Sequence, residues 1–224
     1  MPIRYFPLVT DDTYHVFNRS FGQKTIFLDR GFYNRALQTI KYYRYLETPI
    51  KYSYFIQQHP DQQQDILKQL EKENSPAVEI YSYCLMPNHF HFLIKQLKDR
   101  GILKFISKFS NSYARYFNLK ASAYGPVFQG RFATRQIVTN EQLLHVHRYI
   151  HLNPYSAQIV RSLKDLAKYP YSSLKEYLKP NKNNISSPDL IRGQFASLKS
   201  YQDFIFDQAD YQKQLQYIKT VLLE

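Results

Sequence analysis

The sequence predicts an α+β fold in which helices cover one face of an antiparallel sheet. The strongest indication is residues 81–95, where two apolar, aromatic-rich stretches flank Pro87 and Asn88. Aromatic and β-branched residues favour strands, proline fixes φ and asparagine tolerates turn geometry, so this stretch is typical of a β-hairpin. The second indication is that segments with helical spacing of apolar residues alternate with extended segments before Pro154.

The first third of the chain is expected to hold a strand, a helix and an insertion. Residues 14–19 alternate in the manner of a strand. Residues 32–46 show helical spacing and follow Asp29, whose carboxylate suits an N-cap. Residues 47–76 are largely polar and glutamine-rich, which predicts an insertion with a short helix at 61–73 and no chemistry of its own.

A helix and an extended segment are expected after the hairpin. Residues 102–117 predict an amphipathic helix with a basic side. Residues 124–138 read as one extended segment. On it, Arg131 and Arg135 share a strand face and can meet phosphates.

A further helix is expected over residues 142–153. Thr139 or Asn140 suits its N-cap. Pro154 ends it, because the residue before a proline avoids helical geometry. In chain order, these elements match the ferredoxin-like βαββαβ unit with one added helix.

The composition favours a protein that acts on nucleic acid. The chain of 224 residues has 30 Lys and Arg against 18 Asp and Glu, a formal net charge of +12, and 17% of its residues are aromatic. Cations neutralise phosphates and rings stack on unpaired bases, so we expect a nucleic-acid partner and no membrane. Cys84 is the single cysteine and no apolar run reaches the length of a membrane span, which fits a cytoplasmic protein.

Beyond Pro154 the sequence becomes basic and polar. Amphipathic spacing in residues 188–224, up to the stretch 217–223, predicts one or two helices that pack on the core or span DNA. We therefore expect a domain of residues 1–155 and a basic, helical extension of residues 156–224.

Two imidazoles, an amide and a phenol are expected to form one site. Side chains alternate along a strand, so His89 and His91 lie side by side, opposite the phenylalanines of the hairpin. Tyr149 and Asn153 lie one turn apart on the 142–153 helix. The histidines and the amide oxygen suit a divalent cation, which can polarise a phosphate oxygen. A phenol beside it can attack phosphorus and form a covalent ester with DNA.

Other residues are assigned supporting roles. His145, four residues before Tyr149, is a candidate proton acceptor for the phenol. His15, on the first strand, is interpreted as a structural or DNA-facing histidine rather than a ligand. The cations expected to contact DNA are Arg19, Lys104, Lys108, Arg115, Arg131 and Arg135.

The sequence resembles the single-tyrosine HUH transposases. Residues 86–91 resemble their histidine–hydrophobic–histidine motif, and residues 149–154 resemble the Tyr-Ile-x-x-Asn-Pro stretch of the REP-associated tyrosine transposases. Three further stretches match in order, at residues 14–19, 125–132 and 171–173. The resemblance covers roughly residues 10–175.

This resemblance implies a ferredoxin-like nuclease domain that uses Mg²⁺ or Mn²⁺. It assigns His89, His91 and Asn153 as metal ligands and Tyr149 as the nucleophile. It implies a single-stranded DNA hairpin as the partner and cleavage that leaves a 5′-phosphotyrosine and a free 3′-hydroxyl. We expect such an enzyme to be a monomer or homodimer associated with the bacterial nucleoid. Two departures concern DNA specificity, namely the long insertion and Tyr171, where tryptophan is usual.

Two other functions account for less of the sequence. A domesticated relative of the same fold can bind DNA as a regulator without cleaving it, and a covalent-adduct assay separates the two. A zinc hydrolase of small substrates can combine His89 and His91 with His145 or His151, since imidazole suits zinc better than magnesium. The hydrolase leaves both the net charge and Tyr149 unexplained.

Overall fold

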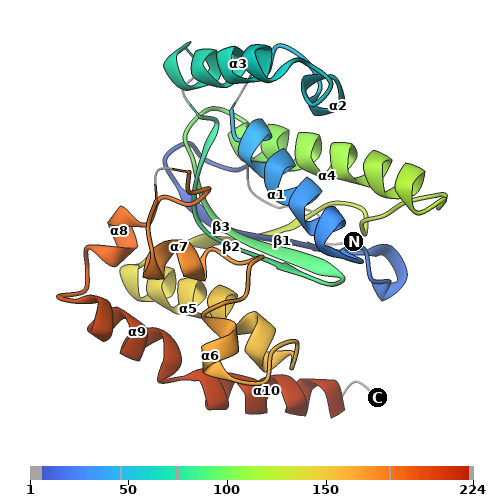
Figure 1. The fold of residues 1–224 in the computed structure, drawn as a ribbon. Coiled ribbons are helices and arrows are strands. Elements are labelled where there is room, and N and C mark those ends of the chain that lie inside the picture. The colour runs from blue at the N-terminus through green and yellow to red at the C-terminus, as the bar shows by residue number, and fades with distance from the viewer. Residues whose placement is uncertain (1–6, 46, 74–75, 182, 222–224) are drawn as a thin grey trace.

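A four-stranded antiparallel sheet in the order β2-β3-β1-β4 forms the centre of the molecule (Figure 1). The structure is a computed structural model that describes residues 7–45, 47–73, 76–181 and 183–221. The strands are β1 (Thr13–Arg19), β2 (Val78–Met86), β3 (His89–Gln96) and β4 (Ala133–Ile137). Order and pairing are those of the ferredoxin-like unit, so the predicted fold class is confirmed.

Helices lie on both faces of this sheet, whereas the sequence predicted them on one face only, because the helices after residue 139 cover the second face (Figure 1). The ferredoxin-like pair α1 and α4 covers one face, whereas α5 and the C-terminal helices cover the other (Figure 1). The first group is α1 (Arg30–Tyr43), α2 (Tyr52–Phe55), α3 (Pro60–Glu73) and α4 (Gly101–Lys120), and a short 3-10 turn, η1 (Phe21–Gln23), follows β1. The second is α5 (Asn140–Ser156), α6 (Leu163–Leu166), α7 (Leu174–Leu178), α8 (Asp189–Arg192), α9 (Leu198–Phe206) and α10 (Ala209–Val221).

Strand β3 contributes to two hydrophobic cores. Phe90, Phe92 and Ile94 are buried with side chains of α1 and α4. Leu93 is buried with side chains of α5 and the C-terminal helices. Alternation along the strand assigns the two sets to opposite faces, so the predicted hairpin and its apolar face are confirmed.

The predicted caps of two helices are also present. Asp29 accepts hydrogen bonds from the backbone N–H groups of Gly31 and Phe32 at the start of α1. Thr139 and Gln142 form a reciprocal capping box at the start of α5. Each such cap typically contributes about 1 kcal/mol, and together they set the first turn of both helices.

The predicted end of α5 is wrong. The helix continues through Pro154 and ends at Ser156, where the Ala157 N–H bonds to the Asn153 carbonyl. Proline removes one backbone donor, but in the last turn this breaks few helical bonds. Pro154 is itself buried, so packing offsets the lost hydrogen bond.

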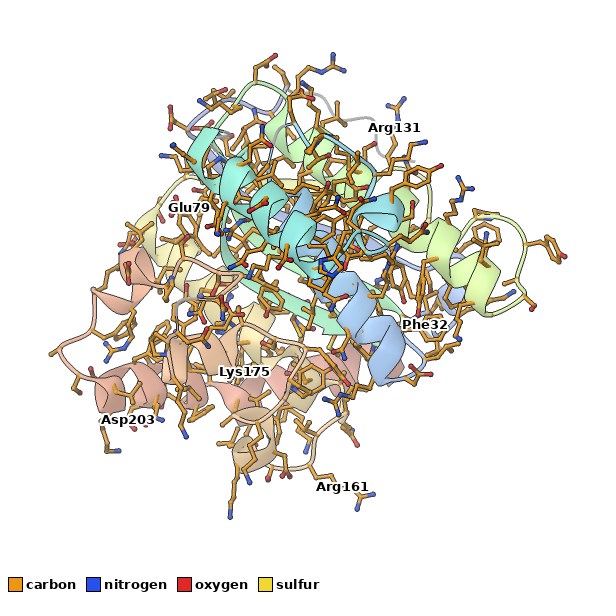
Figure 2. All side chains as sticks on the ribbon, turned by 45° about the horizontal axis from the view of Figure 1, so that its top comes forward. Phe32, Glu79, Arg131, Arg161, Lys175 and Asp203 are labelled. Carbon is orange, nitrogen blue, oxygen red and sulfur yellow. The ribbon has the colours of Figure 1, made fainter. Side chains whose placement is uncertain are left out.

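The predicted extended segment of residues 124–138 is also too long. Only Ala133–Ile137 pairs as β4, and Phe128 forms an isolated bridge with Ser20. Gly130 has a φ of 40°, which interrupts extended geometry just before the strand. Arg131 therefore precedes β4 and does not share a strand face with Arg135. Its side chain projects outward at the edge of the molecule (Figure 2).

The C-terminal helices pack on α5, the first of the two arrangements predicted for them. Tyr201 and Ile205 of α9 are fully buried with Ile150 and Leu152 of α5. The predicted helix near the C-terminus is α10, and residues 222–224 lie outside the described part of the chain. Among the described residues, no helix combines the length and apolar character needed to cross a bilayer.

Candidate active site

Three histidines gather on the α5 side of the sheet. In the β1–β3 register Phe17 pairs with His91, so His15, two residues earlier on β1, lies diagonal to His91 on the same face. The rings meet at a distance of 2.9 Å between His15 Nε2 and His91 Nδ1. His89, two residues before His91, has its ring centre 5.1 Å from that of His91.

Hydrogen bonds orient the two histidines of the motif. His89 Nδ1 lies 2.6 Å from Asn88 Oδ1. An amide oxygen only accepts, so His89 Nδ1 donates and Nε2 keeps a lone pair. When His91 Nδ1 likewise donates to His15, its Nε2 also keeps a lone pair. Metal-bound histidines are usually oriented in this way, by donation of the other ring N–H to a neighbour.

Burial keeps these imidazoles uncharged at neutral pH. Burial, and to a smaller extent the charge of Arg135, lower the pKa of His15 to about 4. Burial and then Arg19 lower the pKa of His89 to about 4. The pKa of His91 lies well below its usual value because of burial, with smaller effects from both other histidines and Arg19. Neutral imidazole is the form that binds a cation.

Helix α5 brings a tyrosine to this cluster. The Tyr149 ring stands edge-on to His91, with ring centres 5.6 Å apart, and to His15, with ring centres 6.0 Å apart. Burial raises the pKa of the Tyr149 phenol, whereas the Asn153 side chain and the charge of Arg19 lower it. Asn153 is buried one turn later, and its Nδ2 donates to the Tyr149 carbonyl oxygen at 2.9 Å.

The predicted site residues thus divide into two groups. The structure brings His89, His91 and Tyr149 together, with Asn153 beside Tyr149, and Arg19 acts electrostatically on the first three. The predicted DNA contacts on α4, namely Lys104, Lys108 and Arg115, lie on the opposite side of the sheet. His145 is exposed, one turn before Tyr149 on α5.

The remaining histidines of α5 belong to a different cluster. His151 Nε2 lies 2.8 Å from Ser173 Oγ, and His147 Nε2 lies 2.9 Å from the Tyr201 hydroxyl. Both rings are fully buried against the C-terminal helices. His151 is therefore not positioned to complete a metal site with the β3 histidines. This excludes the zinc-hydrolase hypothesis in which His151 is the third ligand.

His15 is the site residue that the sequence interpretation missed. Only 8% of its surface is exposed, so it is not DNA-facing, and it bonds directly to His91. Its structural role was predicted, but its place beside the motif was not. The signal lies in the pairing of β1 with β3, which brings two residues 76 positions apart into contact.

The donor set suits a divalent cation. The set predicted from the sequence is two imidazole nitrogens, on His89 and His91, and the amide oxygen of Asn153, which lies beside Tyr149. Nowhere in the described part of the chain do three or more His, Cys, Asp or Glu side chains gather as a metal site. A cation held here would therefore depend on the amide and on oxygens from outside the protein, such as those of phosphate, which suit Mg²⁺ or Mn²⁺.

Comparisons with known proteins give one family match and two structural likenesses. A family model described as "Transposase IS200 like" matches residues 37–153, slightly more than half of the chain. One solved structure, of a REP-associated tyrosine transposase bound to a REP hairpin, aligns with a TM-score of 0.52 at 15% identity, over 84% of this chain and 90% of that one. A putative transposase from Deinococcus radiodurans aligns with a TM-score of 0.34 at 15% identity, over 67% and 95%.

No curated protein matches the chain. At 15% identity the first structural likeness supports the fold alone. The family match is more informative, because residues 37–153 include both histidines of the motif, Tyr149 and Asn153. The chain therefore belongs to the IS200-like transposase family.

Proposed function

We propose that this protein cleaves and rejoins single-stranded hairpin DNA through a 5′-phosphotyrosine on Tyr149. His89, His91 and Asn153 would hold the divalent cation, Mg²⁺ or Mn²⁺. The observation that carries this proposal is the edge-on approach of Tyr149 to the bonded His91–His15 pair in a member of a transposase family. Residues 1–155 would hold this chemistry, and residues 156–224 would brace α5.

The bonds exchanged in such a reaction balance. The Tyr149 oxygen bonds to phosphorus, the bond from phosphorus to the 3′-oxygen breaks, and the departing 3′-oxygen takes up a proton. One phosphodiester is replaced by another, so a later attack by a 3′-hydroxyl on the phosphotyrosine rejoins DNA without an external energy source. When bound, the cation offsets negative charge on the phosphate oxygens.

The protein's own task is to prepare the phenol. Tyr149 must lose its proton before attack, and burial opposes this by raising its pKa. Arg19 and Asn153 act in the opposite direction and favour the phenolate. His145, exposed one turn earlier, is the proposed proton acceptor.

The deciding test is a covalent-adduct assay with Tyr149→Phe. This change removes one oxygen and keeps the ring, so we expect normal binding of a labelled hairpin oligonucleotide and no protein–DNA adduct on a denaturing gel. Tyr155→Phe is the matched control, because Tyr155 lies on the same helix but bonds to Asp210. We expect Tyr155→Phe to form adduct at the wild-type rate.

Two results would contradict the proposal. A protease-sensitive adduct formed by Tyr149→Phe would mean that another residue is the nucleophile. Wild-type protein that binds the hairpin but forms no adduct with Mg²⁺ or Mn²⁺ would favour the non-catalytic regulator instead.

A further inference from the structure

A pocket of about 700 Å³ lies between α1, α4 and the insertion segment around α2. Helices α1 and α4 cover the sheet face to which Phe90 and Phe92 point, whereas His91 lies on the α5 side. The pocket is therefore separated from the candidate active site by the sheet. A ligand held here is not the phosphate that Tyr149 attacks.

The pocket lining carries excess positive charge. Arg35 of α1, Lys51 of the insertion, and Lys108 and Arg115 of α4 contribute to it, and no carboxylate is among the described residues that line it. The nearby Glu47 contacts the Lys104 ammonium group at 3.8 Å and also acts on Lys108. Among the described residues that line the pocket, cations are present and carboxylates are not, which suits an anionic ligand.

Arg35 is the best-defined cation in the pocket. Its guanidinium lies over two rings, 4.4 Å from the centre of Tyr52 and 4.9 Å from that of Tyr116. Its buried Nε has no hydrogen-bond partner among the described residues. Burial lowers the pKa of Arg35, although the ring contacts partly oppose this. An anion at the pocket would compensate a charge that the rings only partly stabilise.

The rim of the pocket is apolar. Leu119 is 75% exposed and Ile56 is 44% exposed, and both line the pocket together with the half-buried ring of Tyr116. Cationic and aromatic side chains beside exposed apolar ones suit an unpaired nucleotide, which offers a phosphate and a flat base. In duplex DNA the bases are paired and stacked, so their flat faces would not be available to this rim. The volume falls within the range of about 300–1,000 Å³ that holds small ligands.

We propose that this pocket binds an unpaired nucleotide of the DNA substrate. Its phosphate would contact Lys51 and Arg115 with Arg35 behind them, and its base would lie against Tyr116 and Leu119. This inference rests on the proposed function, since the nucleotide belongs to the strand that Tyr149 cleaves. It also gives a role to the insertion, for which the sequence suggested no chemistry.

The test is a binding measurement on the double variant Lys51→Glu/Arg115→Glu. Both side chains are exposed, so the fold should be retained, which a thermal melt checks. The matched control is Arg161→Glu/Lys175→Glu, with the same change in charge on exposed side chains among the C-terminal helices (Figure 2). The probe is a short fluorescein-labelled oligothymidylate, with affinity measured by anisotropy over a range of salt.

We expect the pocket variant to bind at least about tenfold more weakly than the control. Its plot of log affinity against log salt should be shallower by about 0.7 for each phosphate that the variant no longer neutralises. Wild-type protein should bind an abasic strand at least about fivefold more weakly than an oligothymidylate of equal length, because the stacking of one base contributes at least that much to affinity. Equal affinity and slope in the two variants would overturn the inference, and equal affinity for the abasic strand would overturn the base contact.

Two further comparisons distinguish DNA from a free nucleotide or phosphate as the ligand, and the pocket proposal from the cleavage proposal. Thymidine monophosphate and inorganic phosphate should compete poorly with the oligonucleotide; competition at equal concentration would mean a free-nucleotide or phosphate site and overturn the assignment to DNA. If wild type forms the adduct and the pocket variant binds DNA unchanged, the pocket assignment is wrong and the proposed cleavage at Tyr149 stands. Weakened binding by the variant without any wild-type adduct would leave the pocket assignment standing and remove the proposed cleavage.

Discussion

Replacing His15 with alanine removes the side chain that faces His91 Nδ1. The two nitrogens are 2.9 Å apart and the two residues are 8% and 6% exposed, so the change leaves His91 Nδ1 facing a buried space rather than bulk solvent. A buried N–H without a partner costs about 1–3 kcal/mol, and turning the His91 ring is the simplest way to avoid that cost. Removal of such an outer partner typically lowers metal affinity or activity by about 10–100-fold.

The assay is adduct formation with a hairpin oligonucleotide across a Mn²⁺ titration. We expect His15→Ala to raise the Mn²⁺ concentration for half-maximal rate by about 10–100-fold while hairpin affinity stays unchanged. His15→Gln supplies an acceptor oxygen and should recover part of the effect. An unaltered Mn²⁺ dependence in a folded His15→Ala protein would refute the orienting role, and equal losses in binding and rate would indicate general damage to the fold.

Three other changes test separate parts of the structure. Arg19→Ala removes a charge that lowers the pKa of Tyr149, so the pH–rate profile of adduct formation should move to higher pH; an unmoved profile contradicts the electrostatic effect. The pKa of His151 is lowered by burial to about 3, so the unfolded chain binds more protons between pH 6.5 and 3 and stability falls as pH falls. Urea unfolding should show that His151→Gln lacks this contribution, up to about 1.4 kcal/mol per pH unit. Gly101→Ala would bring a Cβ into steric conflict with the Ala77 carbonyl oxygen and should lower the free energy of unfolding by about 1–3 kcal/mol. Thermal melting checks this, and an unchanged melting temperature would mean that α4 shifts freely.

Local pattern was sufficient for much of the fold. The hairpin around Pro87 and the caps at Asp29 and Thr139 depend on neighbouring residues, and all were predicted. The end of α5 was not, because burial of Pro154 is a tertiary effect that outweighs its usual helix-ending tendency. The β4 boundary failed because the sequence does not reveal the backbone conformation of Gly130.

In the candidate site, too, local pattern predicted some residues and long-range contacts decided the others. His89 and His91 were placed on one face by alternation, and Tyr149 and Asn153 on one stripe by helical spacing. His15 was separated from them by strand register, which is a long-range property. The pocket beside α2 was equally out of reach, since it forms where an insertion folds back on two helices.

The alternation of β3 between two cores has a consequence for molecules that fold incorrectly. Shifting β3 by one residue would turn Phe90 and Phe92 toward α5 and expel His91 from its pairing with β1. In such a chain the side chains of β3 would face the wrong cores, and His89 and His91 would point away from Tyr149. Correct registration of β3 is therefore a single requirement shared by both cores and the proposed metal site.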